Sequence, residues 1–328
     1  MQHKGGPRLL ATDREGALLL ERARIHVEGG RIVYHITDDD QRREYNIPHV
    51  NLAVLFMGQG TSITQDAMRL LGEEGVHLVV TGTGGTPLHM GGLTNYAATK
   101  HFRDILPIYL STELSLKAAK SVMRDRADRM RKIGGLGAQK YLLQRDTSGL
   151  NRICSQFLEK LPGCKDIQQL LGVEGNFAKA CYAEFARMSG ASRDGAFRRD
   201  PGGKDVDKKQ PMDPMKRING LIDHGNYLCY GMAGAALWAL GIPPHMSIFH
   251  GKTRAGGLVF DLADGFKDAL VLPIAFASVL SKKDDDAEKT FRSRLISAFD
   301  DRAILSEAIG SVDRMIVATS PVPAPPHA

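Results

Sequence analysis

The first hundred residues alternate hydrophobic with polar positions, which is the period of β-strands. ARIHVE and RIVYHI, joined at Gly29-Gly30, predict a β-hairpin with one apolar face. NLAVLFM, at 51–57, is apolar without interruption and predicts a buried strand. VHLVV, which follows Gly75, predicts another strand. This part of the chain therefore predicts a small β domain.

One helix interrupts the strands. Ser62 and Gln65 match the S-x-x-Q capping box that opens a helix, and Gly75 ends the pattern. The side chains predicted to point inward are Ile63, Ala67, Leu70 and Leu71. The prediction is one helix inserted into the β domain.

From about residue 100 the apolar period changes to 3.6, which predicts helices. The expected helices are 111–133, 166–188, 217–240, 258–280 and 288–316. The stretch from Tyr227 to Ile242 carries no charge but is shorter than the roughly 20 residues of a membrane span. We interpret it as part of a helix at the centre of a large core.

The fold class is therefore α+β: a small β-rich domain at 1–95, followed by a larger all-α domain at 96–316. Residues 190–213 are rich in Gly, Arg, Lys and Asp and have few large apolar side chains, so they predict a mobile basic loop. The proline-rich segment 317–328 predicts a disordered tail.

Composition narrows the class of protein. The 328 residues are 43% hydrophobic and 24% charged, as expected of a soluble globular protein. The net charge of +6 favours a polyanionic partner. The four cysteines form no C-x-x-C pair, and MQHKGGPRLL at the N-terminus has no apolar signal region. We expect reduced, mostly buried thiols and a cytoplasmic location.

Two patterns have competing interpretations. Lys117, Lys120 and Arg124 share one face of the helix at 111–133 and could be a solvated face or a stripe that tracks phosphates. GTGGTP, at 82–87, suggests a nucleotide loop, but the G-x-G-x-x-G match is incomplete and the Walker lysine is missing. A plain turn is the better interpretation.

Glu174 lies on the apolar stripe of its helix, between Leu170 and Phe177. A carboxylate in that position is costly to bury without a partner. A buried salt bridge and a functional role both explain it.

The segment HGKTRAGGLVFDLAD, at 250–264, gathers His250, Asp261 and Asp264. The two aspartates project from one side of a helix start, where capping alone could account for them. Together with Glu174, however, they form a set of oxygen and nitrogen ligands that suits Mg²⁺ or Mn²⁺. Lys252 and Arg254 could then hold a phosphate bound to that metal.

Four segments resemble a known family in order and spacing. They are GTSITQDAMRLLGEEGVHLVV, LLGVEGNFAKACYAEF, NGLIDHGNYLCYGMAGAALWALG and HGKTRAGGLVFDLADGFKD. The chain resembles the CRISPR-associated spacer-acquisition integrase and endonuclease, the first of two core adaptation proteins, over about residues 8–315. The form of the last segment is most similar to the type I-F branch.

The resemblance implies a β-sandwich at 1–95 that pairs two copies into a homodimer, followed by the catalytic helical domain. It implies one Mg²⁺ or Mn²⁺ ion held by Glu174, His250 and either Asp261 or Asp264. In the family's D-x-A-D pattern, matched here by DLAD, the first aspartate is often supporting and the second the ligand, but the sequence leaves the choice open. Tyr230 matches a tyrosine beside that site, and Lys252 and Arg254 match a basic segment. Asn219 and Asn226 match paired asparagines on the central helix, whose role is either structural or to support the metal ligands.

The family joins short foreign DNA to the CRISPR array by transesterification, in which a 3′-OH attacks a phosphodiester; with water as the nucleophile it acts as a nuclease. The implied partners are double-stranded DNA, from the protospacer and the CRISPR repeat, and a second core adaptation protein, separate or fused to the helicase-nuclease. No membrane partner is implied. A non-catalytic DNA-binding scaffold is the alternative, and an enzyme that uses GTGGTP to bind a nucleotide ranks last.

Overall fold

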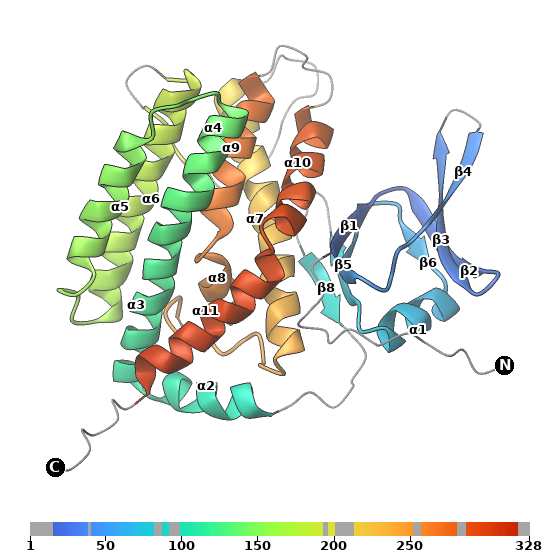
Figure 1. Cartoon of the computed structure of the whole chain (residues 1–328), viewed down its shortest axis with the longest axis horizontal. Coiled ribbons are helices and arrows are strands. Elements are labelled where there is room, and N and C mark those ends of the chain that lie inside the picture. The colour runs from blue at the N-terminus through green and yellow to red at the C-terminus, as the bar shows by residue number, and fades with distance from the viewer. Residues whose placement is uncertain are drawn as a thin grey trace.

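The computed structural model of the chain describes residues 16–38, 41–81, 87–91, 99–192, 196–200, 213–251, 257–280 and 287–320. Strands dominate up to residue 91, and every described element from residue 100 onward is helical (Figure 1). The predicted α+β class is therefore confirmed. The predicted boundary at 95/96 falls outside the described residues.

Two four-stranded sheets form the β domain (Figure 1). The first has the order β1-β5-β7-β8 and the second the order β4-β3-β2-β6. Their bounds are β1 Gly16–Leu20, β2 Ala23–Glu28, β3 Arg31–Asp38, β4 Gln41–Asn46, β5 Leu52–Met57, β6 Ser62–Ile63, β7 His77–Thr81 and β8 Pro87–Gly91. The predicted hairpin is β2 with β3, and Gly29 and Gly30 at its turn have positive φ angles of 56° and 78°.

Strand β5 is buried on both faces, as its uninterrupted apolar sequence predicts. Leu55 and Met57 belong to the core of the β domain, whereas Val54 and Phe56 belong to the large core of the helical domain. Phe56 approaches Gly231 of helix α7 (Pro214–Ala239), where an added Cβ would lie 2.3 Å from the Phe56 ring. The first sheet therefore joins the two domains.

Helix α1 spans Gln65–Glu73, but its cap differs from the prediction. Thr64, not Ser62, accepts a hydrogen bond from the backbone nitrogen of Ala67 at 3.4 Å. Ser62 belongs to β6, which pairs with β2, and this pairing shifts the start of the helix. Ala67 and Leu71 face the core, as expected.

The helical domain contains eleven further helical segments among the described residues. They are α2 Lys100–Leu110, α3 Thr112–Arg129, a π-helical turn Met130–Gly134, α4 Gly135–Tyr141, α5 Ser148–Lys160, α6 Ile167–Ser189, α7 Pro214–Ala239, α8 Gly257–Ala263, α9 Lys267–Leu280, α10 Ala287–Asp301 and α11 Ile304–Thr319. Helix α7 is buried along most of its length. No described helix has the length and apolarity needed to cross a bilayer.

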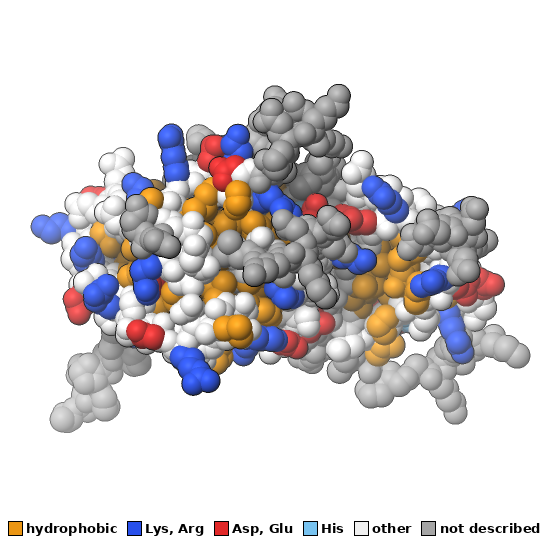
Figure 2. All heavy atoms as spheres, turned by 90° about the horizontal axis from the view of Figure 1, so that it is seen from above, with side chains coloured by type: hydrophobic (Ala, Val, Ile, Leu, Met, Phe, Trp, Pro, Cys, Tyr) orange, Lys and Arg blue, Asp and Glu red, His pale blue; other side chains and the backbone are white. Residues whose placement is uncertain are grey.

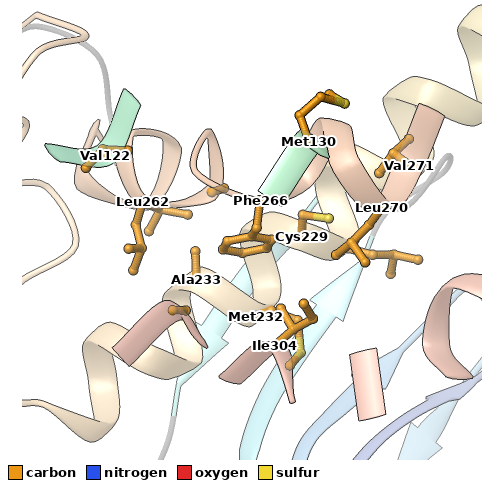
Figure 3. Close-up of a cluster of buried hydrophobic side chains, with 14 of the residues drawn as sticks. Val122, Met130, Cys229, Met232, Ala233, Leu262, Phe266, Leu270, Val271 and Ile304 are labelled. Atoms are coloured by element: carbon orange, nitrogen blue, oxygen red, sulfur yellow. The ribbon is translucent and has the colours of Figure 1, made fainter. Parts of the chain in front are cut away.

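Two of the predicted long helices are each divided in two. The helix expected at 258–280 breaks between α8 and α9, where the Gly265 carbonyl accepts a hydrogen bond from the Arg129 guanidinium at 3.1 Å. The helix expected at 288–316 breaks before α11, where Ala303 has a φ angle of 47°. Phe266 anchors the first break by pointing among Cys229, Ala233 and Met232 in the core (Figure 3).

Three smaller predictions meet different outcomes. The four cysteines are buried and free, as expected. The predicted tail at 317–328 begins too early, because α11 continues to Thr319, whose hydroxyl donates to the Ile316 carbonyl at 2.8 Å.

Part of the predicted mobile loop is anchored, since Phe197 packs 5.3 Å from Phe276, ring centre to ring centre. Residues 193–195 and 201–212 of that loop, and 82–86 of GTGGTP, lie outside the described residues.

Candidate active site

Glu174 lies on α6 with only 18% of its side chain exposed, on the stripe formed by Leu170 and Phe177. Asp166 caps this helix by accepting from the Gln169 backbone nitrogen at 2.8 Å. The partner of Glu174 is Arg126 of α3, whose guanidinium donates to the Glu174 carboxylate. The sequence left open a buried salt bridge or a functional role, and the ion pair is present.

Arg126 also donates to Asp268 of α9, with 2.5 Å between Nη2 and Oδ2. Burial opposes the charge of Arg126, but the two carboxylates outweigh burial and raise its pKa. Burial likewise opposes the charge of Asp268, yet Arg126 and Lys267 hold the pKa of that carboxyl below its ordinary value. The three groups form a charged triad that joins α3, α6 and α9.

Asp261 fixes the position of His250 through contacts on the Nδ1 side of the imidazole. Its carboxylate is fully buried on α8 and accepts hydrogen bonds from the backbone nitrogens of Ile248, Phe249 and His250 and from the Ser247 hydroxyl. It also lies 2.6 Å from His250 Nδ1. A carboxylate accepts, so His250 donates to Asp261 from Nδ1, and its Nε2 atom faces the other side.

Asp264 lies on that other side, with its Oδ2 atom 3.1 Å from His250 Nε2. Lys267, one helical turn further along, contacts the same carboxylate. Burial lowers the pKa of Lys267 to about 8, although Asp268 acts in the opposite direction. The order along this line of contacts is therefore Asp261, His250, Asp264, Lys267.

Tyr230 of α7 adjoins this line. Its ring packs edge-on against Phe260 at 4.6 Å, and the Lys267 ammonium lies 6.0 Å from the ring centre. Asn219, at the start of the same helix, accepts from the Arg199 guanidinium at 2.9 Å and donates to the Arg198 carbonyl at 3.1 Å. Of the two roles expected of Asn219, the structural one agrees with these contacts.

The donor set fits a divalent cation in its chemistry. His250 Nε2 and Asp264 Oδ2 have the separation of two ligands of one ion, and Arg126 and Lys267 already balance negative charge at Glu174 and Asp264. Glu174 is paired with Arg126 instead, and its carboxylate does not fall within 4.8 Å of both His250 and Asp264 in the described structure.

A different group of possible metal ligands lies closer together than Glu174, His250 and Asp264 do. Among the described residues, the His, Cys, Asp and Glu side chains that form a group of three or more with their ligand atoms within 4.8 Å of one another are His26, Glu28, His35 and Glu44. These residues lie in the β domain, on β2, β3 and β4, and the sequence patterns did not single them out.

The cationic residues predicted to bind DNA are only partly described. Lys120 donates to the Pro162 carbonyl at 3.2 Å, and Lys117 pairs with Glu113 at 2.7 Å on the same helix. Arg124 is exposed. Lys252 and Arg254 lie outside the described residues. Figure 2 shows Lys and Arg side chains spread over one face of the molecule among acidic and apolar ones.

Three residues of the site were not predicted: Arg126, Lys267 and Asp268. Arg126 carried a usable signal, because it lies four residues from both Val122 and Met130 on the buried face of α3. It is thus a cation on an apolar stripe, the counterpart of Glu174 on α6. Lys267 and Asp268 follow Asp264 by three and four residues, which places them on the same side of the turn.

A sequence profile of the family described as CRISPR associated protein Cas1 matches residues 18–302. The chain belongs to the Cas1 family. The CRISPR-associated endonuclease Cas1 of Pectobacterium atrosepticum is 33% identical, with 93% of each chain covered. The protein of the same name from Pseudomonas aeruginosa is 35% identical over 87% of each chain.

Solved structures agree with this family at the level of the fold. The crystal structure of a TtCas1-DNA complex superposes with a TM-score of 0.66 at 23% identity, covering 95% of each chain. A Cas1 protein from Thermotoga maritima superposes with a TM-score of 0.67 at 15% identity, covering 92% of this chain and 97% of the other. The two-part architecture, strands first and helices after, is therefore that of Cas1 proteins.

Proposed function

We propose that this Cas1 family member is a metal-dependent DNA integrase and endonuclease of CRISPR adaptation. The observation that carries the proposal is the line from Asp261 through His250 to Asp264, in which a buried carboxylate fixes the imidazole and leaves Nε2 facing a second carboxylate. The curated relatives with at least 33% identity are named endonucleases, which supports the same activity.

Glu174, His250 and Asp264 would hold the Mg²⁺ or Mn²⁺ ion, and Asp261 would position His250. This assignment follows the family's pattern, in which the first aspartate supports and the second binds the ion, and it makes a choice that the sequence left open. Asp261 already accepts from four protein donors besides His250 Nδ1, so its lone pairs are occupied. A carboxylate behind a ligating imidazole orients the ring and raises its basicity.

A bound divalent ion would supply Lewis acidity toward the phosphoryl oxygen of the scissile phosphodiester. With Nδ1 donating to Asp261, His250 would offer the lone pair of Nε2 to that ion. Arg126 orients the Glu174 carboxylate from the α3 side. Tyr230, whose ring lies beside Lys267, would orient the terminal nucleotide.

Several finer assignments follow from the family. Double-stranded DNA, from protospacer and CRISPR repeat, is the proposed substrate, contacted through Arg124, Lys117, Lys120, Lys252 and Arg254. The proposed partners are a second copy, paired through the β domain at 1–95, and the second core adaptation protein. Membership of the type I-F branch is proposed from the form of the segment HGKTRAGGLVFDLADGFKD.

The activity can be tested by a strand-transfer assay. The substrates are a labelled duplex with a free 3′-OH and a plasmid that carries a CRISPR array. The unchanged chain should be active with Mn²⁺ or Mg²⁺ and inactive with EDTA. Glu174→Gln and His250→Ala should each lose at least about 100-fold in rate. Glu288→Gln, on the exposed side of α10, is the matched control and should remain fully active. If both site variants retain full Mn²⁺-dependent activity, the assigned site is wrong. If the unchanged chain binds DNA but shows no metal-dependent activity, the scaffold alternative is correct.

A further inference from the structure

The second sheet of the β domain carries two histidines and two glutamates on one face. The register pairs His35 of β3 with Glu44 of β4, and pairs His26 of β2 with Val33, two residues from His35. Ile25 and Ile32, at alternating positions, point into the core of the β domain. His26, Glu28, His35 and Glu44 therefore share the opposite face.

Their separations match those of ligands around a single tetrahedral ion. His26 Nε2 lies 3.1 Å from His35 Nε2 and 3.5 Å from Glu28 Oε2, and all four residues offer one ligand atom within 4.8 Å of the others. Bond lengths of 2.0–2.2 Å to zinc place neighbouring tetrahedral ligands about 3.3 Å apart. The imidazole rings, stacked at 4.4 Å, already point their Nε2 atoms at each other.

Glu44 approaches the same group from β4. Its Oε2 atom lies 3.5 Å from His35 Nδ1, and it offers a ligand atom within 4.8 Å of those of the other three residues. His35 is only 6% exposed, so its ring is held in place, whereas Glu28 and Glu44 are exposed and can close on an ion.

The surroundings leave this group accessible. A surface hollow lined by Glu28, Arg31, Val33 and Glu44 adjoins the histidines and provides a route for the ion. Arg24 and Arg31 share the face, but in the described part of the chain the ion pairs of Glu28 and Glu44 are with His26 and His35.

We propose that His26, His35, Glu28 and Glu44 form a binding site for a zinc-class divalent transition ion, separate from the candidate active site. Two imidazoles and two carboxylates suit Zn²⁺ far better than Mg²⁺, which prefers oxygen ligands and retains its water. Because β2, β3 and β4 each supply ligands, a bound ion would clamp the three strands together.

Zinc titration against a chromophoric chelator tests the site in the full chain, without DNA. An Asp264→Asn background removes a proposed ligand of the active site, so zinc bound there does not contribute. This chain should bind one Zn²⁺ in preference to Mg²⁺ and unfold at a higher temperature with zinc. Adding His26→Ala or Glu28→Gln should weaken zinc binding by at least about 100-fold.

His101→Ala is the matched control, because His101 pairs with Asp313 in the helical domain and shares no contact with the cluster. It should bind zinc like its background. Circular dichroism verifies folding, and Glu28→Gln, at an exposed position, decides the result if His26→Ala does not fold. Zinc binding that is equal in all these chains, or absent from the background, overturns the proposal.

Discussion

The two clusters of ionisable residues in this protein differ in how they are assembled. In the helical domain, Arg126 joins Glu174, 48 residues away in sequence, to Asp268, 142 residues away, and all three are mostly buried. In the β domain, His26, Glu28, His35 and Glu44 lie within one stretch of three consecutive strands, and both glutamates are exposed. One cluster is built by packing and the other by strand register.

The difference shows what each arrangement can do. A buried charge must be paired, so every carboxylate of the helical cluster has a cation or a set of N–H donors, and its geometry is fixed. The exposed carboxylates of the β-domain cluster are solvated, so they are free to reorient around an ion. The buried cluster is suited to catalysis, where geometry must be set in advance, and the exposed one to structural metal binding.

The largest expected effect comes from removing the shared cation of the buried cluster. Arg126→Met leaves Glu174 and Asp268 buried without their partner, and should lower the free energy of unfolding by about 3–5 kcal/mol. Urea denaturation measures this. Glu28→Gln, in the exposed cluster, should leave the unfolding midpoint unchanged in metal-free buffer. Equal midpoints for the two variants would remove the distinction between the clusters.

The next effect separates the two aspartates. Asp261→Asn should lower Mn²⁺-dependent strand transfer by about 10- to 100-fold, because His250 loses the carboxylate that orients it. Higher Mn²⁺ concentration should restore part of this activity, since the ligands themselves remain. Asp264→Asn should not be rescued in the same way. If a higher Mn²⁺ concentration rescues Asp264→Asn but not Asp261→Asn, then Asp261 is the ligand and Asp264 the positioning residue.

A third prediction concerns the contact between the two domains. Gly231→Ala places a methyl group 2.3 Å from the Phe56 ring and should destabilise the protein by about 1–3 kcal/mol. Gly220→Ala, in the same helix with open space around it, is the control and should be neutral or stabilising. Thermal denaturation distinguishes the two, and an equal response would mean that β5 does not pack tightly on α7.

The smallest effect concerns DNA binding on the surface of the helical domain. Arg124→Ala should lower the slope of log affinity against log salt concentration by about 1, as expected for the loss of one phosphate contact. Arg69→Ala, on α1 of the β domain, should leave the slope unchanged. Fluorescence anisotropy at several salt concentrations measures both, and an unchanged slope for Arg124→Ala would restore the interpretation of a solvated helix face.

Local signals predicted most of the fold. The β2–β3 hairpin, the buried strand β5 and the position of Glu174 on a buried stripe all follow from periods of two and 3.6. The breaks at Gly265 and Ala303 did not, because Arg129 binds the Gly265 carbonyl from another helix and periodicity continues across both breaks. The N-terminal cap of α1 was misplaced because Ser62 pairs in a sheet.

The candidate site was predictable only in part, for a related reason. Glu174, His250, Asp261 and Asp264 emerged from their patterns and from the family resemblance, but the pairing of Glu174 with Arg126 depends on how α3 packs on α6. The order of contacts around His250 depends on a loop that folds back over α8. The β-domain cluster, by contrast, follows from hairpin register once His26 and His35 are placed on opposite strands.

A crystal structure of the chain grown with Mn²⁺, with anomalous scattering recorded at the manganese edge, tests the central claim most directly. The account predicts an anomalous peak in the helical domain, bound by His250 Nε2, Asp264 and Glu174, with Asp261 still behind the imidazole at Nδ1. A peak coordinated by Asp261 instead of Asp264 would contradict the assigned roles. Manganese found only among His26, Glu28, His35 and Glu44 would contradict the proposed active site itself.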